Sequence, residues 1–425
     1  MKIDELYEIY LQYPSIETDT RKLKKGDLFV ALKGLNFNGN EFAQKAIDAG
    51  AAYAVIDEQK YASDKTILVE DALLALQQLA HHHRRLFPIP FIAITGSNGK
   101  TTTKELIRAV LSSSYKTYTT EGNLNNHIGV PLTILKIKRD AQMAVIEMGA
   151  NHQKEIASYC KIAEPTHGLI TNCGKAHLEG FGSEEGVKKA KGELYDHLRE
   201  NDGIAFIMWD YDYLRQMSKE IPTVFKYGTA GADIIGETIE NDPYLSVKFI
   251  SGYQGNINTQ LVGSYNLPNV LAAVATGKYF DVEEEKIRKA IENYVPSNSR
   301  SQLIQKGTNT IILDAYNANP SSMQLAIENF ANAKNENKIL ALGSMAELGE
   351  SSLQEHANII QLIGKHTWKH VILVGKNFNA IQHSYMHFSF PEEACAWLKK
   401  QNLTNTYFLI KGSRSTEMEK VLEAF

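Results

Sequence analysis

The chain has few cysteines, no apolar leader and no long hydrophobic run. Cys160, Cys173 and Cys395 form no CxxC motif and cannot all pair, which is typical of small core residues in a reducing compartment. Acidic residues occupy the N-terminal segment where a signal peptide needs apolar ones, and no stretch approaches the roughly 20 consecutive apolar residues of a membrane span. We therefore expect a cytoplasmic protein without a membrane span, and we expect a monomer.

The chain also lacks a large excess of charge of either sign. Its 45 Lys and Arg residues and 49 Asp and Glu residues give a formal net charge of -4. Such a balance gives no broad attraction to nucleic acid or anionic lipid, so we expect no nucleic-acid partner. Any anionic ligand must then be held by a local site. Hydrophobic residues make up 43% and charged residues 22%, which excludes disordered and fibrous classes.

Short apolar runs alternate with helical patterns along nearly the whole chain. This alternation predicts an α/β fold with largely parallel sheets, and the length of 425 residues predicts about three domains. Proline-containing stretches at 86–91 and 294–302 predict the boundaries. The predicted domains are a small N-terminal α/β domain (1–88), a central domain with a parallel sheet (89–297) and a C-terminal doubly wound, Rossmann-like domain (298–425). The predicted strands are 27–32, 53–57, 66–70, 91–95, 143–148, 167–172, 310–316, 338–343, 370–375 and 407–412.

The strongest motif is the glycine-rich segment 91–107, which reads FIAITGSNGKTTTKELI. A strand, a glycine loop and a helix in this order point backbone N–H groups at phosphate, while Lys100 adds a positive charge and the Thr101 hydroxyl can bind Mg²⁺. The loop is a short form, T-G-x-x-G-K-T, because Ile94 stands where the longer P-loop pattern has glycine. A plain glycine turn with a surface lysine is the alternative. The predicted nucleotide contacts are Gly96, Ser97, Asn98, Gly99, Lys100, Thr101 and Thr102.

Two further candidates follow the ends of predicted strands. Glu147 ends the run 143–147 and would lie beside the P-loop in a parallel sheet, where a carboxylate suits Mg²⁺. A helix-capping role for Glu147 is the alternative. His177 follows the strand 167–172 and could face the same crevice as a metal ligand, although an isolated histidine is more often structural.

One lysine lies on the wrong face of its helix. At about 100° per residue, the segment GVKKAKGELY (186–195) puts Lys191 among Val187, Ala190, Leu194 and Tyr195. A buried ammonium must find a partner or lose its charge. A neutral lysine amine can react with carbon dioxide to give a carbamate, an anion that can pair with a metal ion. A lysine that reaches solvent or a carboxylate is the alternative.

Motifs along the whole chain resemble those of the Mur ligase family, which uses ATP to join amino acids or a dipeptide to UDP-linked muropeptides. The "NANP", "AELGE" and "KGSR" runs are similar to those of the members that add D-alanyl-D-alanine, and the "DNPR" of the diaminopimelate-adding members is absent. The other matching segments are DTRKLKKGDLFVALKG, ITGSNGKTTTKE, GNLNNHIGVPLT, VIEMGANHQKEI and AHLEGFGSEEGVKKAKGELY.

The resemblance implies an ATP- and Mg²⁺-dependent amide ligase of peptidoglycan synthesis. It would join D-alanyl-D-alanine to UDP-N-acetylmuramoyl-tripeptide through an acyl phosphate, giving the pentapeptide, ADP and phosphate. The N-terminal domain would bind the UDP-muropeptide, the central domain ATP, and the C-terminal domain the dipeptide. Another Mur-type ligase or a folylpolyglutamate synthase-like ligase is one alternative, and a P-loop NTPase switch is another, although no N-K-x-D guanine signature is present.

The resemblance also implies a role for individual residues. Lys100, His177 and Lys191 would be catalytic. Thr101 and Glu147 would hold one metal ion, while His177 and a carbamylated Lys191 would serve a second. The nucleotide would further contact Asn266, Asn269, Arg300, Asp314, Tyr316 and Asn317. The substrates would contact Thr20, Arg21, Asn123, Asn125, Asn126, Asn319, Lys411, Ser413 and Arg414.

The chain departs from the family pattern at four positions. Tyr265 stands where histidine is usual, Ser299 where glycine is usual, and His127 where glutamate is common. Ala315 replaces a more usual aspartate or serine. None of these positions is the loop lysine, the metal carboxylate or Lys191.

Overall fold

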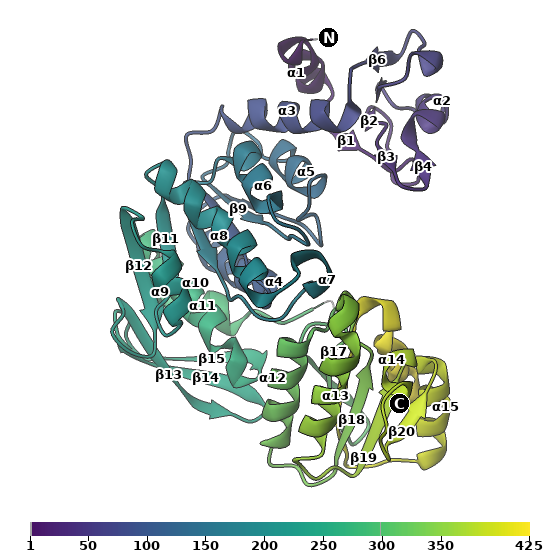
Figure 1. The fold of residues 1–425 in the computed structure, drawn as a ribbon. Coiled ribbons are helices and arrows are strands. Elements are labelled where there is room, and N and C mark those ends of the chain that lie inside the picture. Colours follow the sequence, from purple (N-terminus) through teal and green to yellow (C-terminus); the bar gives the residue numbers. More distant parts are fainter. Residues whose placement is uncertain (1, 298) are drawn as a thin grey trace.

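The structure, a computed structural model, describes residues 2–297 and 299–425. The chain folds into three α/β domains, each built around its own β-sheet (Figure 1). Four strands form the N-terminal sheet, nine the central sheet and six the C-terminal sheet, and a short hairpin pairs β3 with β4. The prediction of a three-domain α/β fold is confirmed, and all ten predicted strands are present. Residue 298, where the third predicted domain begins, lies outside the described residues, so the domain limits stay predictions.

The N-terminal sheet is parallel, in the order β1-β2-β5-β6. Successive side chains of β2 point to opposite faces: Leu28 and Val30 pack in the core that includes α1 and α3, whereas Phe29 packs against α2. The elements of this domain are α1 (Ile3–Gln12), β1 (Ile16–Glu17), β2 (Leu28–Val30), β3 (Lys33–Gly34), β4 (Phe37–Asn38), η1 (Gly39–Phe42), α2 (Ala43–Asp48), β5 (Tyr53–Ile56), η2 (Gln59–Tyr61), β6 (Thr66–Leu68) and α3 (Ala72–Arg84).

Helix α3 joins the N-terminal domain to the central one. It packs against α5 and α6 of the central domain, and the buried Tyr10 hydroxyl donates to the carbonyl of Leu135. His83 Nε2 lies 2.8 Å from the carbonyl oxygen of Ile137. These buried polar contacts join the two domains in addition to the helix packing.

The central sheet has the order β15-β14-β13-β12-β11-β10-β7-β9-β8 and is parallel from β13 to β8. The antiparallel strands β13, β14 and β15 were not among the predicted strands, because β14 alternates buried and exposed residues and forms no apolar run. The elements are β7 (Phe91–Thr95), α4 (Lys100–Ser112), β8 (Thr117–Thr119), α5 (Gly129–Leu135), β9 (Met143–Glu147), α6 (Glu155–Ala163), β10 (His167–Ile170), α7 (Leu178–Phe181), α8 (Glu184–Glu200), β11 (Ile204–Met208), α9 (Asp212–Met217), β12 (Thr223–Gly228), β13 (Ile234–Asn241), β14 (Tyr244–Ser251), β15 (Asn256–Val262), η3 (Ser264–Asn266), α10 (Leu267–Tyr279) and α11 (Glu284–Glu292).

The C-terminal sheet has the order β16-β17-β21-β18-β19-β20, with only β16 antiparallel to its neighbour. Leu340 and Leu409 face a core with α12 and α13, whereas Ile339 and Phe408 face a second core with α15 and η6. Helices on both faces confirm the doubly wound prediction. The elements are β16 (Gln302–Lys306), β17 (Asn309–Asp314), α12 (Pro320–Ala331), β18 (Lys338–Gly343), η4 (Gly349–Ser351), α13 (Ser352–Ile363), β19 (His370–Val374), α14 (Lys376–Asn379), β20 (Met386–Phe388), α15 (Pro391–Gln401), β21 (Tyr407–Lys411), η5 (Arg414–Thr416) and η6 (Met418–Ala424).

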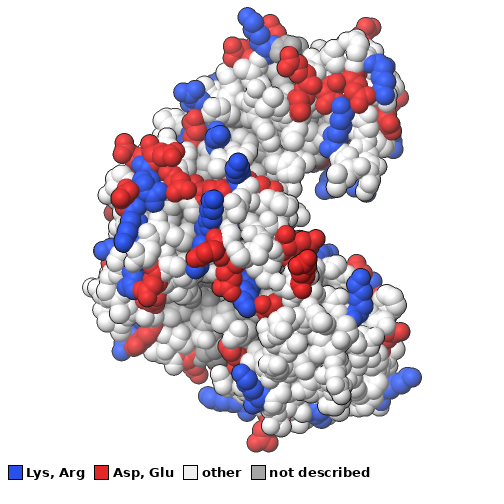
Figure 2. Space-filling view, viewed as in Figure 1, with Lys and Arg blue, Asp and Glu red and all other residues white. Residues whose placement is uncertain are grey.

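The three domains form an arc, with the N-terminal and C-terminal domains on the same side of the central one (Figure 1). Figure 2 shows the surface hollowed between the two outer domains, and acidic and basic side chains are interspersed on this face. Among the described residues, no helix has both the length and the hydrophobicity that a membrane crossing requires.

Candidate functional site

The glycine loop lies where β7 ends and α4 begins, and close packing accounts for its two glycines. Gly96 has a φ of 140°, and a Cβ there would lie 2.0 Å from Thr171 Oγ1. Gly99 has a φ of 79°, and its Cβ would lie 2.8 Å from Asn269 Oδ1. Helix α4 starts at Lys100, so the first N–H groups of the helix have no acceptor within it. The loop therefore has the form of an anion-binding site.

Lys100 folds back over its own loop. Its Nζ donates to the carbonyl of Gly96 at 2.6 Å and to that of Ser97 at 3.2 Å. Burial lowers the pKa of Lys100, while the Glu147 carboxylate opposes that shift. The ammonium is thus held by carbonyl groups that an anionic ligand can replace.

Glu147, at the end of β9, lies beside the glycine loop because β7 and β9 are parallel neighbours in which Ile94 pairs with Glu147. The Thr101 hydroxyl donates to Glu147 Oε2 at 3.0 Å. Asn125, in the loop 121–126 that we call the asparagine loop, donates from Nδ2 to Glu147 Oε1 at 2.8 Å. A carboxylate next to a hydroxyl is a hard oxygen pair, and Mg²⁺ is commonly held by one or two carboxylates together with substrate phosphates, so these donors fit Mg²⁺.

His177 stands at the start of α7 and faces the C-terminal domain. Its Nδ1 lies 2.7 Å from Oε2 of Glu347, in the segment that precedes η4. The histidine beside it holds the pKa of the Glu347 carboxyl below its ordinary value. A backbone bond from Glu179 N to Glu347 O (3.2 Å) supports the same junction.

Lys191 points into the core of the central domain, as the helical periodicity predicts. It is 1% exposed in α8, whereas Lys189 is exposed. Its Nζ donates to the carbonyl of Ala150 at 3.2 Å and lies 5.0 Å from the centre of the Phe181 ring. Burial, reinforced by the positive charge of Lys100, lowers the pKa of Lys191 to about 7. A substantial fraction of this lysine is therefore neutral near neutral pH.

A cleft of about 1000 Å³ lies between the central and C-terminal domains. On its C-terminal side the Arg300 guanidinium lies 3.6 Å from the centre of the Tyr316 ring. On its central side Asn269 Nδ2 donates to Asn266 Oδ1 at 2.8 Å. The predicted residues that line the cleft are Ser97, Asn98, Gly99, Lys100, Thr101, Thr102, Asn123, Asn125, Asn126, Glu147, His177, Asn266, Asn269, Arg300, Asp314, Tyr316, Asn317, Asn319 and Lys411.

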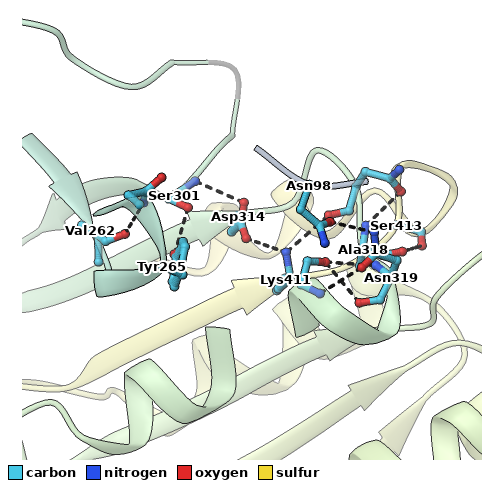
Figure 3. A network of polar contacts seen from close by, with 12 residues as sticks. Asn98, Val262, Tyr265, Ser301, Asp314, Ala318, Asn319, Lys411 and Ser413 are labelled. Carbon is cyan, nitrogen blue, oxygen red and sulfur yellow. Dashed lines mark hydrogen bonds and ion pairs between the residues drawn. The ribbon is translucent and has the colours of Figure 1, made fainter. Parts of the chain in front are cut away.

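A polar network ties the two walls of the cleft together (Figure 3). The Tyr265 hydroxyl contacts Ser301 Oγ at 3.0 Å, and Ser301 N donates to Asp314 Oδ1 at 3.2 Å. Asp314, which is half-buried, forms an ion pair with the buried Lys411. Asn319, which caps helix α12, donates from Nδ2 to Oδ1 of Asn98 in the glycine loop at 2.8 Å (Figure 3). The helix of the C-terminal domain thus begins against the phosphate loop.

Six predicted site residues do not line the cleft, and their roles stay predictions. Gly96 directly precedes the lining residue Ser97, and Lys191 contacts the carbonyl of the lining residue Ala150. Arg21 is exposed on the N-terminal domain and pairs with Asp19 at 2.7 Å, next to Thr20. The remaining two are Ser413, whose hydroxyl donates to Ala318 O (3.2 Å) and accepts from Ala346 N (2.8 Å), and Arg414, which pairs with Glu419 (2.8 Å).

Two residues that the sequence analysis did not predict bear on the proposed metal residues: Glu347, which lines the cleft, and Lys104, which lies beneath Glu147. Glu347 lies in the "AELGE" run, but only the tertiary structure brings it to His177. Lys104 is fully buried in α4 and lies 3.9 Å from Glu147. It shares the apolar face of α4 with Ile107 and Leu111, so the periodicity test that singled out Lys191 would also have found it.

A phosphate loop that faces a second α/β domain is typical of a P-loop nucleotide-binding protein whose site lies between two domains. Comparison with known proteins narrows this class. Family models described as Mur ligase family, catalytic domain, as Mur ligase middle domain, and as Mur ligase, glutamate ligase domain match residues 12–84, 94–277 and 299–414. The chain belongs to the Mur ligase family.

Individual relatives cover almost the whole chain. The UDP-N-acetylmuramoyl-tripeptide–D-alanyl-D-alanine ligase of Escherichia coli (strain K12) is 36% identical over 99% of this chain and 95% of its own length. The crystal structure of MurF from Acinetobacter baumannii is 33% identical, with a TM-score of 0.89 over 96% of this chain and 92% of its own. The structure of the MurF ligase from Thermotoga maritima in complex with ADP is 27% identical, with a TM-score of 0.87 over 98% of this chain and 97% of its own.

The packing around Gly96 predicts that Gly96→Ala weakens nucleotide binding. The added methyl group would meet the Thr171 hydroxyl and push the loop out of shape. We expect ADP affinity, measured by calorimetry, to fall by about tenfold or more, which corresponds to about 1.4 kcal/mol. Gly307→Ala is the control, because Gly307 also has a positive φ but no atom lies within 4 Å of its Cβ position. Equal affinities in the two variants would contradict the packing argument.

The buried amine of Lys191 predicts a pH-dependent stability. Its pKa is about 7 in the folded protein against an ordinary 10.5, so between these values the unfolded chain binds a proton that the native state lacks. Stability should therefore rise with pH in this window, by about 1.4 kcal/mol per pH unit, and level off below it. Urea unfolding in buffer free of carbon dioxide would measure the slope. The rise should be smaller in Lys191→Met than in the wild type, and identical slopes in both proteins would refute the prediction.

Proposed function

We propose that this chain is an ATP-dependent ligase that joins D-alanyl-D-alanine to UDP-N-acetylmuramoyl-tripeptide, giving the pentapeptide, ADP and phosphate. The observation that carries the proposal is the cleft in which the phosphate loop and Glu147 face the segment Asn317–Asn319 of the other domain. The name of the Escherichia coli relative and the ADP in the Thermotoga maritima structure support it. We also propose a cytoplasmic location, where ATP is available, and a monomer.

The chemical problem is that a carboxylate resists attack by an amine. In the proposed reaction the carboxylate attacks the γ-phosphorus of ATP, the bond to the β-phosphate breaks and ADP leaves, and the resulting acyl phosphate has a good leaving group. The loop N–H groups would bind the phosphates, and Lys100 would exchange its two carbonyl acceptors for phosphate oxygens. The amine of the dipeptide then attacks the acyl carbon and phosphate departs.

Helix α12 supplies a further source of positive potential. Its N-terminus, at Pro320, follows the cap residue Asn319 and meets Asn98 of the phosphate loop. The positive end of the helix dipole would thus favour the anionic groups that gather there. Since α12 and the loop belong to different domains, the full site requires both domains together, and closure would also exclude water.

We propose that Mg²⁺ is held by Thr101 and Glu147, whose oxygen donors suit it. When bound, the ion would offset negative charge on the phosphates during transfer. His177 and a carbamate on Lys191 would serve a second ion. The lowered pKa of Lys191, about 7, supports this, because only the neutral amine reacts with carbon dioxide.

We assign the acceptor to the side of the cleft nearest the N-terminal domain. The asparagine loop carries Asn123, Asn125 and Asn126, which line the cleft, and the surface is hollowed between the two outer domains (Figure 2). The UDP end would lie near Thr20 and Arg21, and the peptide carboxylate near the phosphate loop. Lys411, Ser413 and Arg414 would help to place the dipeptide.

Ligation itself is the direct test. Purified protein should release phosphate from ATP only when UDP-N-acetylmuramoyl-tripeptide and D-alanyl-D-alanine are both present, with the pentapeptide detected by mass spectrometry. Parallel reactions should offer other muropeptides, other amines, and folate with glutamate. Turnover only with one of these pairs would replace the proposed substrates. Phosphate release at full rate without any acceptor would indicate an NTPase instead.

The carbamate hypothesis predicts that Lys191→Ala reduces ligation by about 100-fold or more, since the second metal site loses its ligand. Added short-chain carboxylic acids should restore part of the activity, whereas bicarbonate should not. Carbon-13 NMR of wild-type protein with labelled bicarbonate should detect the carbamate directly. Lys189→Ala, on the exposed face of the same helix, is the control and should be close to wild type. Near-normal rates in Lys191→Ala would rule the hypothesis out.

A further inference from the structure

Lys104 is a buried lysine that the proposed mechanism does not use. It lies in α4, one turn after Lys100, and is 0% exposed. Its Nζ donates to the carbonyl of Thr120 at 2.6 Å and lies 2.9 Å from Oε1 of Glu105 and 3.9 Å from Oε2 of Glu147. Full burial of an ammonium is costly unless it is paired and hydrogen-bonded, so the Thr120 carbonyl and the two carboxylates together stabilise this position.

Thr120 connects this lysine to the proposed metal carboxylate. It follows β8, and its hydroxyl accepts from the backbone N of Glu147 at 2.9 Å while its carbonyl accepts from Lys104. Lys104 therefore holds Glu147 in two ways: through Thr120 it supports the backbone, and by charge it supports the carboxylate. Thr101 contacts the same carboxylate from the cleft.

The asparagine loop is also anchored at Thr120 and Glu147. It begins directly after Thr120, and Asn125 returns to donate to Glu147 Oε1 at 2.8 Å. A further bond, from Gly149 N to Asn125 O at 2.7 Å, closes the loop onto the end of β9. Both ends of the loop thus meet residues that Lys104 holds, so a shift of Thr120 would move the loop and the carboxylate together.

We propose that Lys104 is a positioning residue for the ligase reaction, a role that rests on the proposed function. Its ammonium holds the Glu147 carboxylate and Thr120, the residue directly before the asparagine loop, in fixed positions relative to the phosphate loop. The proposed metal ligand Glu147 and the asparagine side chains proposed to bind the acceptor substrate are then positioned together relative to the ATP phosphates. Lys104 touches neither the cleft nor a reacting group, so it acts only through Glu147 and Thr120.

Lys104→Met tests the proposal, with Glu105→Gln as the matched control. Both variants break the Lys104–Glu105 ion pair, but only the first also releases Thr120 and Glu147. Ligation at saturating ATP should need about 10- to 100-fold more Mg²⁺ for half-maximal rate in Lys104→Met, the usual range for loss of a residue behind a metal ligand. Glu105→Gln should stay close to wild type.

A second measurement is independent of metal and of activity. Hydrogen–deuterium exchange without Mg²⁺ or nucleotide should show faster exchange of the amides of residues 120–126 in Lys104→Met than in Glu105→Gln. If Lys104→Met does not fold, Lys104→Gln replaces it, since its amide can still donate to Thr120 but carries no charge toward Glu147. An unchanged Mg²⁺ requirement and unchanged exchange in either folded lysine variant would overturn the positioning role. Absence of ligation in the wild type would instead contradict the proposed function.

Discussion

The site depends on the parallel pairing of β7 between β9 and β10. In a parallel sheet the carboxyl ends of neighbouring strands lie at one edge, so the register that pairs Ile94 with Glu147 and Thr95 with Ile170 brings three distant segments together. The phosphate loop follows β7, the carboxylate ends β9, and the segment leading to His177 follows β10. A slip of one residue in β9 would turn the carboxylate to the other face of the sheet.

Three lysines near this edge of the sheet differ in the groups that contact their ammonium nitrogen. Lys100 is held by carbonyls of its own loop, Lys104 by a carbonyl and two carboxylates, and Lys191 by a single carbonyl. Lys191, with no carboxylate in hydrogen-bonding contact and with Lys100 nearby, has a pKa lowered to about 7, and burial lowers the pKa of Lys100 as well. Sites that concentrate buried charge in this way are stabilised less than an apolar core would be, which is typical of functional regions.

Much of the fold could be predicted because its central strands are buried on both faces and form continuous apolar runs, as in residues 91–95 and 338–343. The strands β14 and β15 were missed because buried and exposed residues alternate along them, so no continuous apolar run marks them. The inward direction of Lys191 could be read from helical periodicity alone. Lys104 carried the same signal and was missed because it lies within a motif whose other lysine already had a role.

The sequence alone determined the phosphate loop, the three-domain α/β architecture and the buried face of α8, because each rests on local spacing between residues close together in the chain. Only the tertiary structure decided which distant side chains meet: His177 with Glu347, Asn98 with Asn319, and Lys175 with Glu355 at 2.8 Å. All three contacts join the central and C-terminal domains. Their partners depend on how two independently packed sheets meet, and no local pattern encodes that arrangement.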